Sequence, residues 1–243
     1  MTQNTTPPND PWLAKGEEKS KAVQIIFADI APIYDRLNDI MSLSLHQRWR
    51  NNTARFLKLS PDAKVLDLCC GTGSFLQVLS RYIGSKGELT GMDFCEPMLE
   101  IARRKIGPKA ELILGDVSDL PFENHHFDAI TIGWGLRNVS DRERVLSESF
   151  RVLKKEGQFV AIDMAIPVQP FLRLVSAWLL NVAIPKIWLF SGQEKAGHYL
   201  SKSTQGFISR NQMKLSLEAA GFTQVEWKNF LMGNICMYWG KKA

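Results

Sequence analysis

The sequence predicts an α/β fold in which a mostly parallel sheet carries helices on both faces. From Lys64 onward, short apolar runs typical of buried strands alternate with stretches whose apolar residues recur at helical spacing. The first apolar run breaks into the turn Cys69-Cys70-Gly71-Thr72-Gly73 and restarts as a helix. Such alternation is typical of parallel sheets covered by crossover helices. A chain of 243 residues that is 45% hydrophobic can bury this core as one domain, predicted to span 16–243.

The part before the sheet, 16–60, is expected to form a helical cap. Residues 17–31 place apolar side chains on one stripe, and Pro32 ends or kinks that helix. A second helix is expected over 46–59, closed by Pro61. Residues 1–15 are polar, with three prolines, and lack the basic start and apolar middle of a signal peptide, so we expect a flexible arm on a cytoplasmic protein.

The segment 64–164 supplies most of the sheet. Ser140 and Glu143 have capping-box spacing ahead of one of its helices, and Pro97 fits the first turn of another. The predicted strands are 64–69, 87–93, 110–114, 127–133 and 157–164, and the predicted helices are 73–83, 96–106 and 141–153.

The remaining chain divides into an apolar insertion, 165–210, and a final unit, 211–243. Within the insertion, 171–190 carries only two charged residues, Arg173 and Lys186, with twelve residues between them. A bilayer takes about 20 apolar residues to cross, so no transmembrane helix is expected. A buried core helix and an amphipathic lid that contacts a membrane surface both remain open. The final unit should hold a helix at 211–220 and the last strands of the sheet, one of them antiparallel, at 224–231 and 234–240.

Charge and cysteine usage exclude some functions. The net charge of +5 is modest and comes without a tight Lys/Arg cluster, which argues against a dedicated nucleic-acid-binding protein. The four cysteines lack the C-x-x-C spacing of a zinc site, so we expect no metal and a reducing compartment: Cys69, Cys70, Cys95 and Cys236.

The glycine turn and the acids that follow it predict a nucleoside site. Gly71 and Gly73 let the backbone turn tightly and approach a ligand, and Asp93, at the end of the next apolar run, can accept hydrogen bonds from both ribose hydroxyls. The turn is not suited to bind a pyrophosphate, because Leu76 replaces the third glycine of a dinucleotide motif and the turn has no basic residue. Asp116, after a third apolar run, can accept from an adenine amino group. The spacing of these pieces resembles the class I S-adenosylmethionine-dependent methyltransferases.

Two further motifs resemble those of the ubiquinone/menaquinone biosynthesis C-methyltransferases, and this resemblance covers nearly all of the chain after residue 18. The matching positions are Tyr34, Asp35, Asn38, Ser42, His46, Trp49 and 135–139, which read Gly-Leu-Arg-Asn-Val. The resemblance implies a Rossmann-like, seven-stranded sheet and methyl transfer from S-adenosylmethionine to a ring carbon of a polyprenylated quinol, demethylmenaquinol foremost. It also implies cofactor contacts at Thr72, Asp93, Asp116, Val117 and Gly133. The full predicted set of cofactor-binding residues adds Asp67, Gly71, Gly73 and Phe94.

The chemistry of such a transfer points to Arg137 as the main catalytic candidate. A ring carbon attacks a methyl sulfonium when a hydroxyl on the ring becomes a phenolate, and a guanidinium can hold that oxyanion. Asn138 could orient the hydroxyl or a water, while a relayed water, Tyr34, Asp35 or His198 could remove the proton. Alternatively, Arg137 pairs with one of the acids near it in sequence, Asp141 or Glu143.

Several functional alternatives stay open at this point. The acceptor could be another apolar molecule, such as a sterol or a fatty acyl chain, or the protein could be a non-catalytic S-adenosylmethionine-binding regulator. A nicotinamide dehydrogenase is disfavoured by the missing third glycine and the missing Tyr-x-x-x-Lys motif. The head group of the quinol, peripheral contact with the inner face of the membrane through 171–190, and a homodimer are likewise left open.

Overall fold

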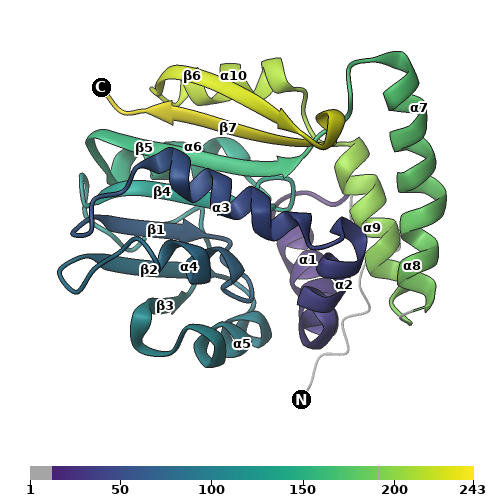
Figure 1. Cartoon of the computed structure of the whole chain (residues 1–243), viewed down its shortest axis with the longest axis horizontal. Helices are drawn as coiled ribbons and strands as arrows, with labels where there is room; N and C mark the ends of the chain where they lie inside the picture. The colour runs from purple at the N-terminus through teal and green to yellow at the C-terminus, as the bar shows by residue number, and fades with distance from the viewer. Residues whose placement is uncertain (1–12, 191) are drawn as a thin grey trace.

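The computed structural model describes residues 13–190 and 192–243, and its strands form one seven-stranded sheet (Figure 1). The sheet order is β3-β2-β1-β4-β5-β7-β6. Neighbouring strands are parallel except β7, which runs antiparallel to both β5 and β6, so the predicted mostly parallel sheet is confirmed. The strands are β1 (Lys64–Leu68), β2 (Glu88–Asp93), β3 (Glu111–Leu114), β4 (Phe127–Gly133), β5 (Leu153–Met164), β6 (Thr223–Phe230) and β7 (Ile235–Lys241).

Helices cover both faces of the sheet because alternate strand residues point to opposite sides. On one face, Leu66 and Ile130 pack with α6 (Arg142–Val152) and α10 (Arg210–Ala219). On the other face, Val65 and Ala129 pack with α3 (Leu45–Leu57), α4 (Ser74–Leu79) and α5 (Glu96–Ile106). The two faces thus bury separate apolar clusters, and both hold the carboxyl ends of the parallel strands in place.

The N-terminal cap has one helix more than the sequence predicts. It consists of α1 (Gly16–Ile30), the 3-10 turn η1 (Ala31–Ile33), α2 (Tyr34–Ser42) and α3. We missed α2 because it is only nine residues long and buries only Leu37. The expected arm over 1–15 lies mostly outside the described residues.

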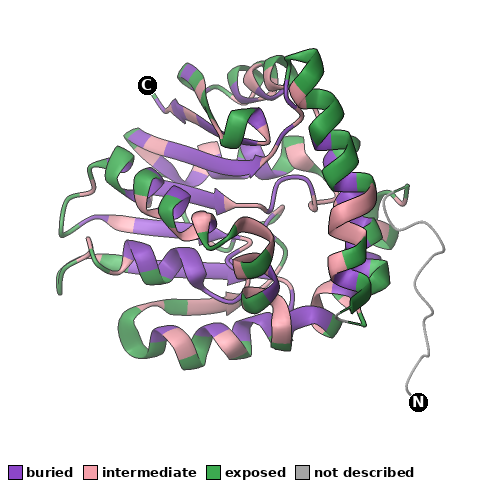
Figure 2. Cartoon of the chain, turned by 45° about the vertical axis from the view of Figure 1, so that its right-hand side comes forward, coloured by how far each residue is buried: buried purple, intermediate pink, exposed green. Residues whose placement is uncertain are grey.

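The insertion forms a long helix that stands beside the sheet with most of its surface exposed (Figures 1 and 2). Its parts are α7 (Pro170–Trp178), the π-helical η3 (Leu179–Ala183) and α8 (Ile184–Phe190), and α9 (Glu194–Gln205) packs against α8. Only 17% of its most apolar 18-residue window is buried, so the buried core helix is wrong. By length and composition alone, the 21 residues of 170–190 pass as a membrane span, contrary to our expectation from the spacing of the two charges.

Three local predictions also need correction. The helix predicted over 73–83 ends at Leu79, and the strand predicted over 157–164 already begins at Leu153. The cap of α6 is Asp141, whose Oδ1 accepts from the backbone N–H of Arg144 at 2.9 Å, instead of the expected capping box. A complete capping box instead starts α10, with Ser209 and Gln212 as its two members.

Candidate active site

A cavity opens where β1, β2 and β4 end, at the edge of the sheet where parallel α/β folds bind ligands. We call it the strand-end cavity. Its lining comprises Ser20, Phe27, Tyr34, Cys69, Gly71, Asp93, Phe94, Met98, Asp116, Val117, Ser118, Gly133, Trp134, Gly135, Asn138, Val139 and Ser140. Most of the predicted cofactor-binding residues are therefore brought together here, although they come from separate turns of the chain.

Backbone donors fix the Asp93 carboxylate at the edge of this cavity. The N–H of Gly71 donates to its Oδ2 at 2.8 Å, and the N–H of Cys95 donates to its Oδ1 at 2.9 Å. Burial raises the pKa of Asp93 to about 6, although these donors favour its charged form. A carboxylate held in this way still has lone pairs free for the hydroxyls of a ribose.

The two glycines of the turn have different roles. Gly71 has a φ of +53° and lines the cavity, and a Cβ added there would meet no atom within 4 Å. Gly73 (φ +75°) does not line it, and its Cβ would lie 3.1 Å from side-chain atoms of both Ala102 and Ile106. Gly73 thus starts α4 and lets α5 pack closely, which corrects its expected part in ligand approach.

Asp116, Val117 and Phe94 form the far side of the strand-end cavity. Asp116 Oδ1 accepts from the backbone N–H and the hydroxyl of Ser118, both at 2.8 Å, while Val117 is buried. The carbonyl of Phe94 accepts from Gln24 Nε2 at 2.7 Å, which ties α1 over this end. The polar rim and apolar wall suit the flat, partly polar ring of an adenine.

A smaller cavity continues from the glycine turn beneath Tyr34. This small cavity is lined by Tyr34, Arg50, Asp67, Cys69, Cys70, Gly71, Thr72, Ser74, Phe75 and Gly133. Asp67 Oδ1 accepts from Thr131 Oγ1 at 2.6 Å, but its buried Oδ2 has no hydrogen-bond partner. Burial raises the pKa of Asp67 to about 7.

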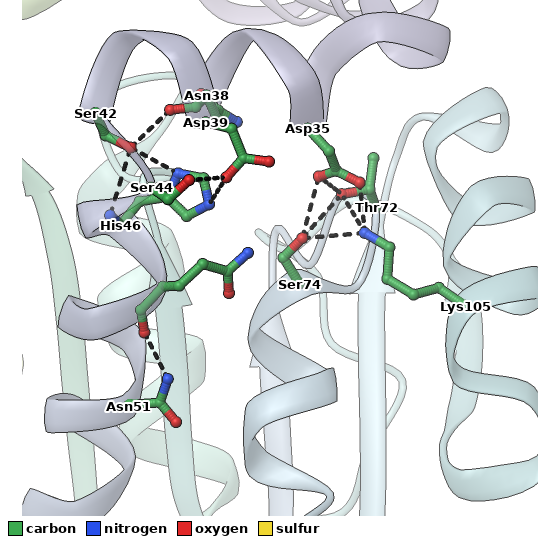
Figure 3. Close-up of polar contacts among 11 residues, drawn as sticks. Asp35, Asn38, Asp39, Ser42, Ser44, His46, Asn51, Thr72, Ser74 and Lys105 are labelled. Atoms are coloured by element: carbon green, nitrogen blue, oxygen red, sulfur yellow. Dashed lines mark hydrogen bonds and ion pairs between the residues drawn. The ribbon is translucent and has the colours of Figure 1, made fainter.

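Asp35 joins the cap to the glycine turn through its carboxylate (Figure 3). Its Oδ1 accepts from Thr72 Oγ1 at 2.7 Å and from Ser74 Oγ at 3.1 Å, and its Oδ2 pairs with Lys105 Nζ at 2.5 Å. Burial opposes the charge, yet Lys105 and the two hydroxyls hold the pKa of Asp35 below its usual value. Asp35 lines none of the cavities described here, so we withdraw it as a base and assign it and Thr72 a positioning role.

A larger and more apolar cavity lies between the cap and the insertion. This helix cavity, of about 210 Å³, shares Phe27, Tyr34 and Trp134 with the strand-end cavity, so the two adjoin. Its other lining residues are Ile26, Ile30, Asn38, Met41, Ser42, His46, Trp49, Arg50, Arg137, Met164, Leu179, Leu180, Ala183, Ile184, Ile187, Trp188, Ala196, Tyr199, Leu200, Leu231, Asn234 and Ile235.

Arg137 lines the helix cavity but is held by a partner that sequence reasoning did not identify. Its Nη1 donates to Asp163 Oδ1 at 2.6 Å and to the carbonyl of Trp134 at 2.8 Å, while its Nε is buried and unpartnered. The alternative pairing with Asp141 or Glu143 is therefore wrong, since Asp163 comes from β5, far along the chain. Burial lowers the pKa of Arg137, but the Asp163 carboxylate more than offsets this, and the net shift is upward.

Asn138 links the two cavities through a tyrosine that the motifs did not reveal. Its Oδ1 accepts from the Tyr199 hydroxyl at 3.0 Å, and its Nδ2 donates to the carbonyl of Trp134 at 3.1 Å. Burial raises the pKa of Tyr199, so this hydroxyl stays protonated. The neighbouring His198 is exposed and lies 3.6 Å from Glu194, which removes it from the candidate bases.

His46 is a site residue whose importance the sequence did not show. It lines the helix cavity, its Nδ1 lies 2.9 Å from Ser42 Oγ, and its Nε2 lies 3.4 Å from Asp39 Oδ1 (Figure 3). Burial, with Arg50 nearby, lowers the pKa of His46, so the neutral imidazole dominates at neutral pH. Its place in a matched motif was the available signal in the sequence, and the structure adds that it lines the helix cavity.

The fold and the site define a class I S-adenosylmethionine-dependent methyltransferase. Asp93 and Asp116, the acids expected at the ribose and the adenine, both line the strand-end cavity, and the buried Oδ2 of Asp67 beside it has no hydrogen-bond partner. Solved structures share the fold: a methyltransferase of Aquifex aeolicus superposes with a TM-score of 0.61 at 18% identity, covering 86% of this chain and 98% of that one. A phosphoethanolamine N-methyltransferase of Haemonchus contortus, solved with S-adenosylhomocysteine, gives 0.57 at 14% identity, over 76% of this chain and 49% of that one.

The chain belongs to the ubiE/COQ5 methyltransferase family, whose model matches residues 15–242. It is 37% identical over 226 residues to the demethylmenaquinone methyltransferase of Lactiplantibacillus plantarum, covering 90% of this chain and 95% of that protein. It is 35% identical over 233 residues to the protein of the same name from Staphylococcus haemolyticus, covering 95% and 98%. The predicted family, enzyme class and cofactor are confirmed.

Proposed function

We propose that this enzyme methylates a ring carbon of a polyprenylated quinol, with demethylmenaquinol as the acceptor. The observation that carries the proposal is the helix cavity, which adjoins the strand-end cavity at Tyr34 and Trp134. Its inner end offers aromatic and polar side chains to a ring, whereas Leu179, Ala183 and Ile187 offer an apolar path to a tail. The names of the relatives support the same acceptor.

The cofactor supplies an electrophilic methyl group on a sulfonium, so the chain must make the ring carbon electron-rich. Removal of a hydroxyl proton does this, and His46 is the group on the helix cavity that can accept a proton near neutral pH. Arg137, held by Asp163, presents fixed positive charge to the developing phenolate. The apolar wall keeps water away and strengthens these interactions.

A pH profile tests the role of His46. Because the pKa of His46 is lowered by burial, kcat should rise from acid pH and level off below neutrality, and His46→Asn should lower kcat by about a hundredfold and remove this limb. S-adenosylhomocysteine affinity should not change. An unaltered profile in His46→Asn would show that another group takes the proton.

We also propose that α7 and α8 contact the inner face of a bilayer while the rest of the enzyme stays in the cytoplasm. Their outward side chains include Phe171, Trp178 and Phe190, exposed by 73%, 58% and 90%. Residues 164–193 contain no acid, and the two cations Arg173 and Lys186 suit anionic headgroups. A lipid-dissolved acceptor would then enter the helix cavity beside the inner face of the same helix.

The acceptor is tested with labelled S-adenosylmethionine and a panel of reduced acceptors. We expect label in demethylmenaquinol, less in a benzoquinol that lacks the ring methyl, and none in a sterol or a fatty acid. Label in the sterol or lipid alone would replace the quinol as substrate. Cofactor binding without transfer to any acceptor would favour the regulator.

A further inference from the structure

A further cavity adjoins the helix cavity at Arg137 and Tyr199, which line both. This basic cavity, of about 260 Å³, is lined mainly by residues of α1, of α9 and of 136–143, the segment that leads from β4 into α6. Its other charged lining residues are three cations and one acid: Lys19, Arg142, Lys202 and Glu143. The methyl transfer proposed above uses none of these four, so their excess of positive charge calls for a separate explanation.

Lys19 is a partly buried cation whose charge is not neutralised by an acid. Its Nζ donates to the carbonyls of Arg137 at 3.2 Å and Val139 at 2.7 Å, and no carboxylate in the described chain pairs with it. An ammonium group has three N–H donors, so one of them stays available to a ligand. Burial and the nearby Arg142 both lower the pKa of Lys19. An anion bound between the two cations would offset both effects.

Arg142 and Lys202 add two more sets of donors to the basic cavity. Nη2 of Arg142 pairs with Glu143 Oε1 at 2.8 Å, while its buried Nε has no hydrogen-bond partner. Lys202, in the last turn of α9, is exposed, and its Nζ forms no ion pair with any described residue. Glu143 Oε1 also accepts from Ser216 Oγ at 3.4 Å, so the one acid is already shared between two donors. The lining therefore offers donors and positive charge without matching acceptors.

We propose that the basic cavity binds a phosphate group, supplied either by a phospholipid headgroup or by free phosphate. A phosphate has several strong acceptor oxygens, and lysine and arginine donors are its usual partners in proteins. A headgroup is within reach because α9 packs against α8 (Figure 1), and Gln205 Nε2 of α9 donates to Asn181 Oδ1 of the insertion at 2.8 Å. The bound group would hold Lys19 in place, and with it the backbone around Arg137. The proposal does not depend on which acceptor the enzyme methylates.

Two assays on the whole enzyme separate the two sources of phosphate. Calorimetry measures the binding of inorganic phosphate, and co-sedimentation compares vesicles of phosphatidylcholine alone with vesicles that also contain phosphatidylglycerol. Lys202→Gln and Arg142→Gln should each weaken binding of the preferred probe by about tenfold, as expected for a lost charged hydrogen bond. Lys195→Gln removes an exposed cation from the same helix, outside the cavity, and is the matched control. Unchanged affinity for S-adenosylhomocysteine shows that each variant is folded.

The pattern across the two assays decides between the sources. Weaker binding of inorganic phosphate in Lys202→Gln, with Lys195→Gln like the parent, supports a site for free phosphate. A loss confined to the vesicles with phosphatidylglycerol supports a site for a lipid headgroup. The proposal is overturned if Lys202→Gln behaves like Lys195→Gln in both assays, which would leave only a general attraction between charges. It is also overturned if the parent binds neither inorganic phosphate nor phosphatidylglycerol in preference to phosphatidylcholine.

Discussion

The strand-end cavity and the helix cavity meet at Tyr34 and Trp134 but are built in different ways. The first is formed mainly by turns that directly follow strands, with a few residues of α1, α2 and α5, and backbone N–H groups orient the Asp93 carboxylate. The second is formed mainly by helices of the cap and the insertion, together with Trp134 and Arg137, which follow β4, and Ile235 of β7. We infer from this difference that the turns at the strand ends determine cofactor binding, whereas the helices of the cap and the insertion determine which acceptor binds.

Arg137→Ala should give the largest effect of the substitutions proposed here. It should impair the reaction with the acceptor and leave cofactor binding unchanged. We expect turnover to drop by more than about a hundredfold with S-adenosylhomocysteine affinity unchanged. The free energy of unfolding should fall by about 3–5 kcal/mol, because Asp163 would be left buried and unpaired. Turnover assays, calorimetry and urea denaturation measure the three quantities.

Two further variants sharpen that result. Adding Asp163→Asn to Arg137→Ala should recover part of the stability, since the lone carboxylate is gone, but none of the turnover. The exposed Arg104→Ala serves as the control. Normal turnover in Arg137→Ala would remove the guanidinium from the mechanism.

Asp93→Ala should have the opposite pattern of effects: it should weaken cofactor binding and leave acceptor binding unchanged. Loss of the two ribose contacts, about 3 kcal/mol together, should weaken S-adenosylhomocysteine binding by about a hundredfold in calorimetry. The acceptor KM at saturating cofactor should stay the same. The exposed Asp119→Ala is the control, and a matching change in acceptor KM would show that the two cavities are not independent.

The comparison also explains what the sequence could and could not predict. The sheet, its strands and the acids at their ends were predictable, because Asp93 and Asp116 follow apolar runs within their own short motifs. The pairing of Arg137 with Asp163, the Tyr199–Asn138 bond and the cavity position of His46 were not, because each depends on elements distant in sequence. Asp35 was misread because its partners Thr72 and Lys105 lie on other elements.

Exposed aromatic residues on the insertion should contribute to membrane binding and not to cofactor binding. Replacing Phe171 and Trp178 together by serine should lower binding to anionic liposomes by about tenfold or more, because each ring buries apolar surface in the bilayer. Co-sedimentation measures this effect, with S-adenosylhomocysteine affinity as the control. No liposome binding by the parent enzyme would end the membrane proposal.

Asp67→Asn should produce the smallest effect, a change in how the free energy of unfolding depends on pH. The folded pKa of about 7 exceeds the usual 3.8, so the folded state keeps a proton that the unfolded state loses. The contribution of Asp67 to the free energy of unfolding therefore decreases as the pH rises from about 4 to about 7. Urea denaturation should show the variant more stable than the parent at pH 8, with the gap closing toward pH 4. Parallel pH curves would contradict the burial of that charge.

The most direct test of the account is the position of the methyl group in the product. Purified enzyme is incubated with S-adenosylmethionine labelled with ¹³C on its methyl group and with demethylmenaquinol in anionic vesicles, and the lipid product is examined by NMR. The account predicts one label per molecule, on the ring carbon beside a hydroxyl. Label on an oxygen, or no labelled quinol while S-adenosylhomocysteine still binds, would contradict it.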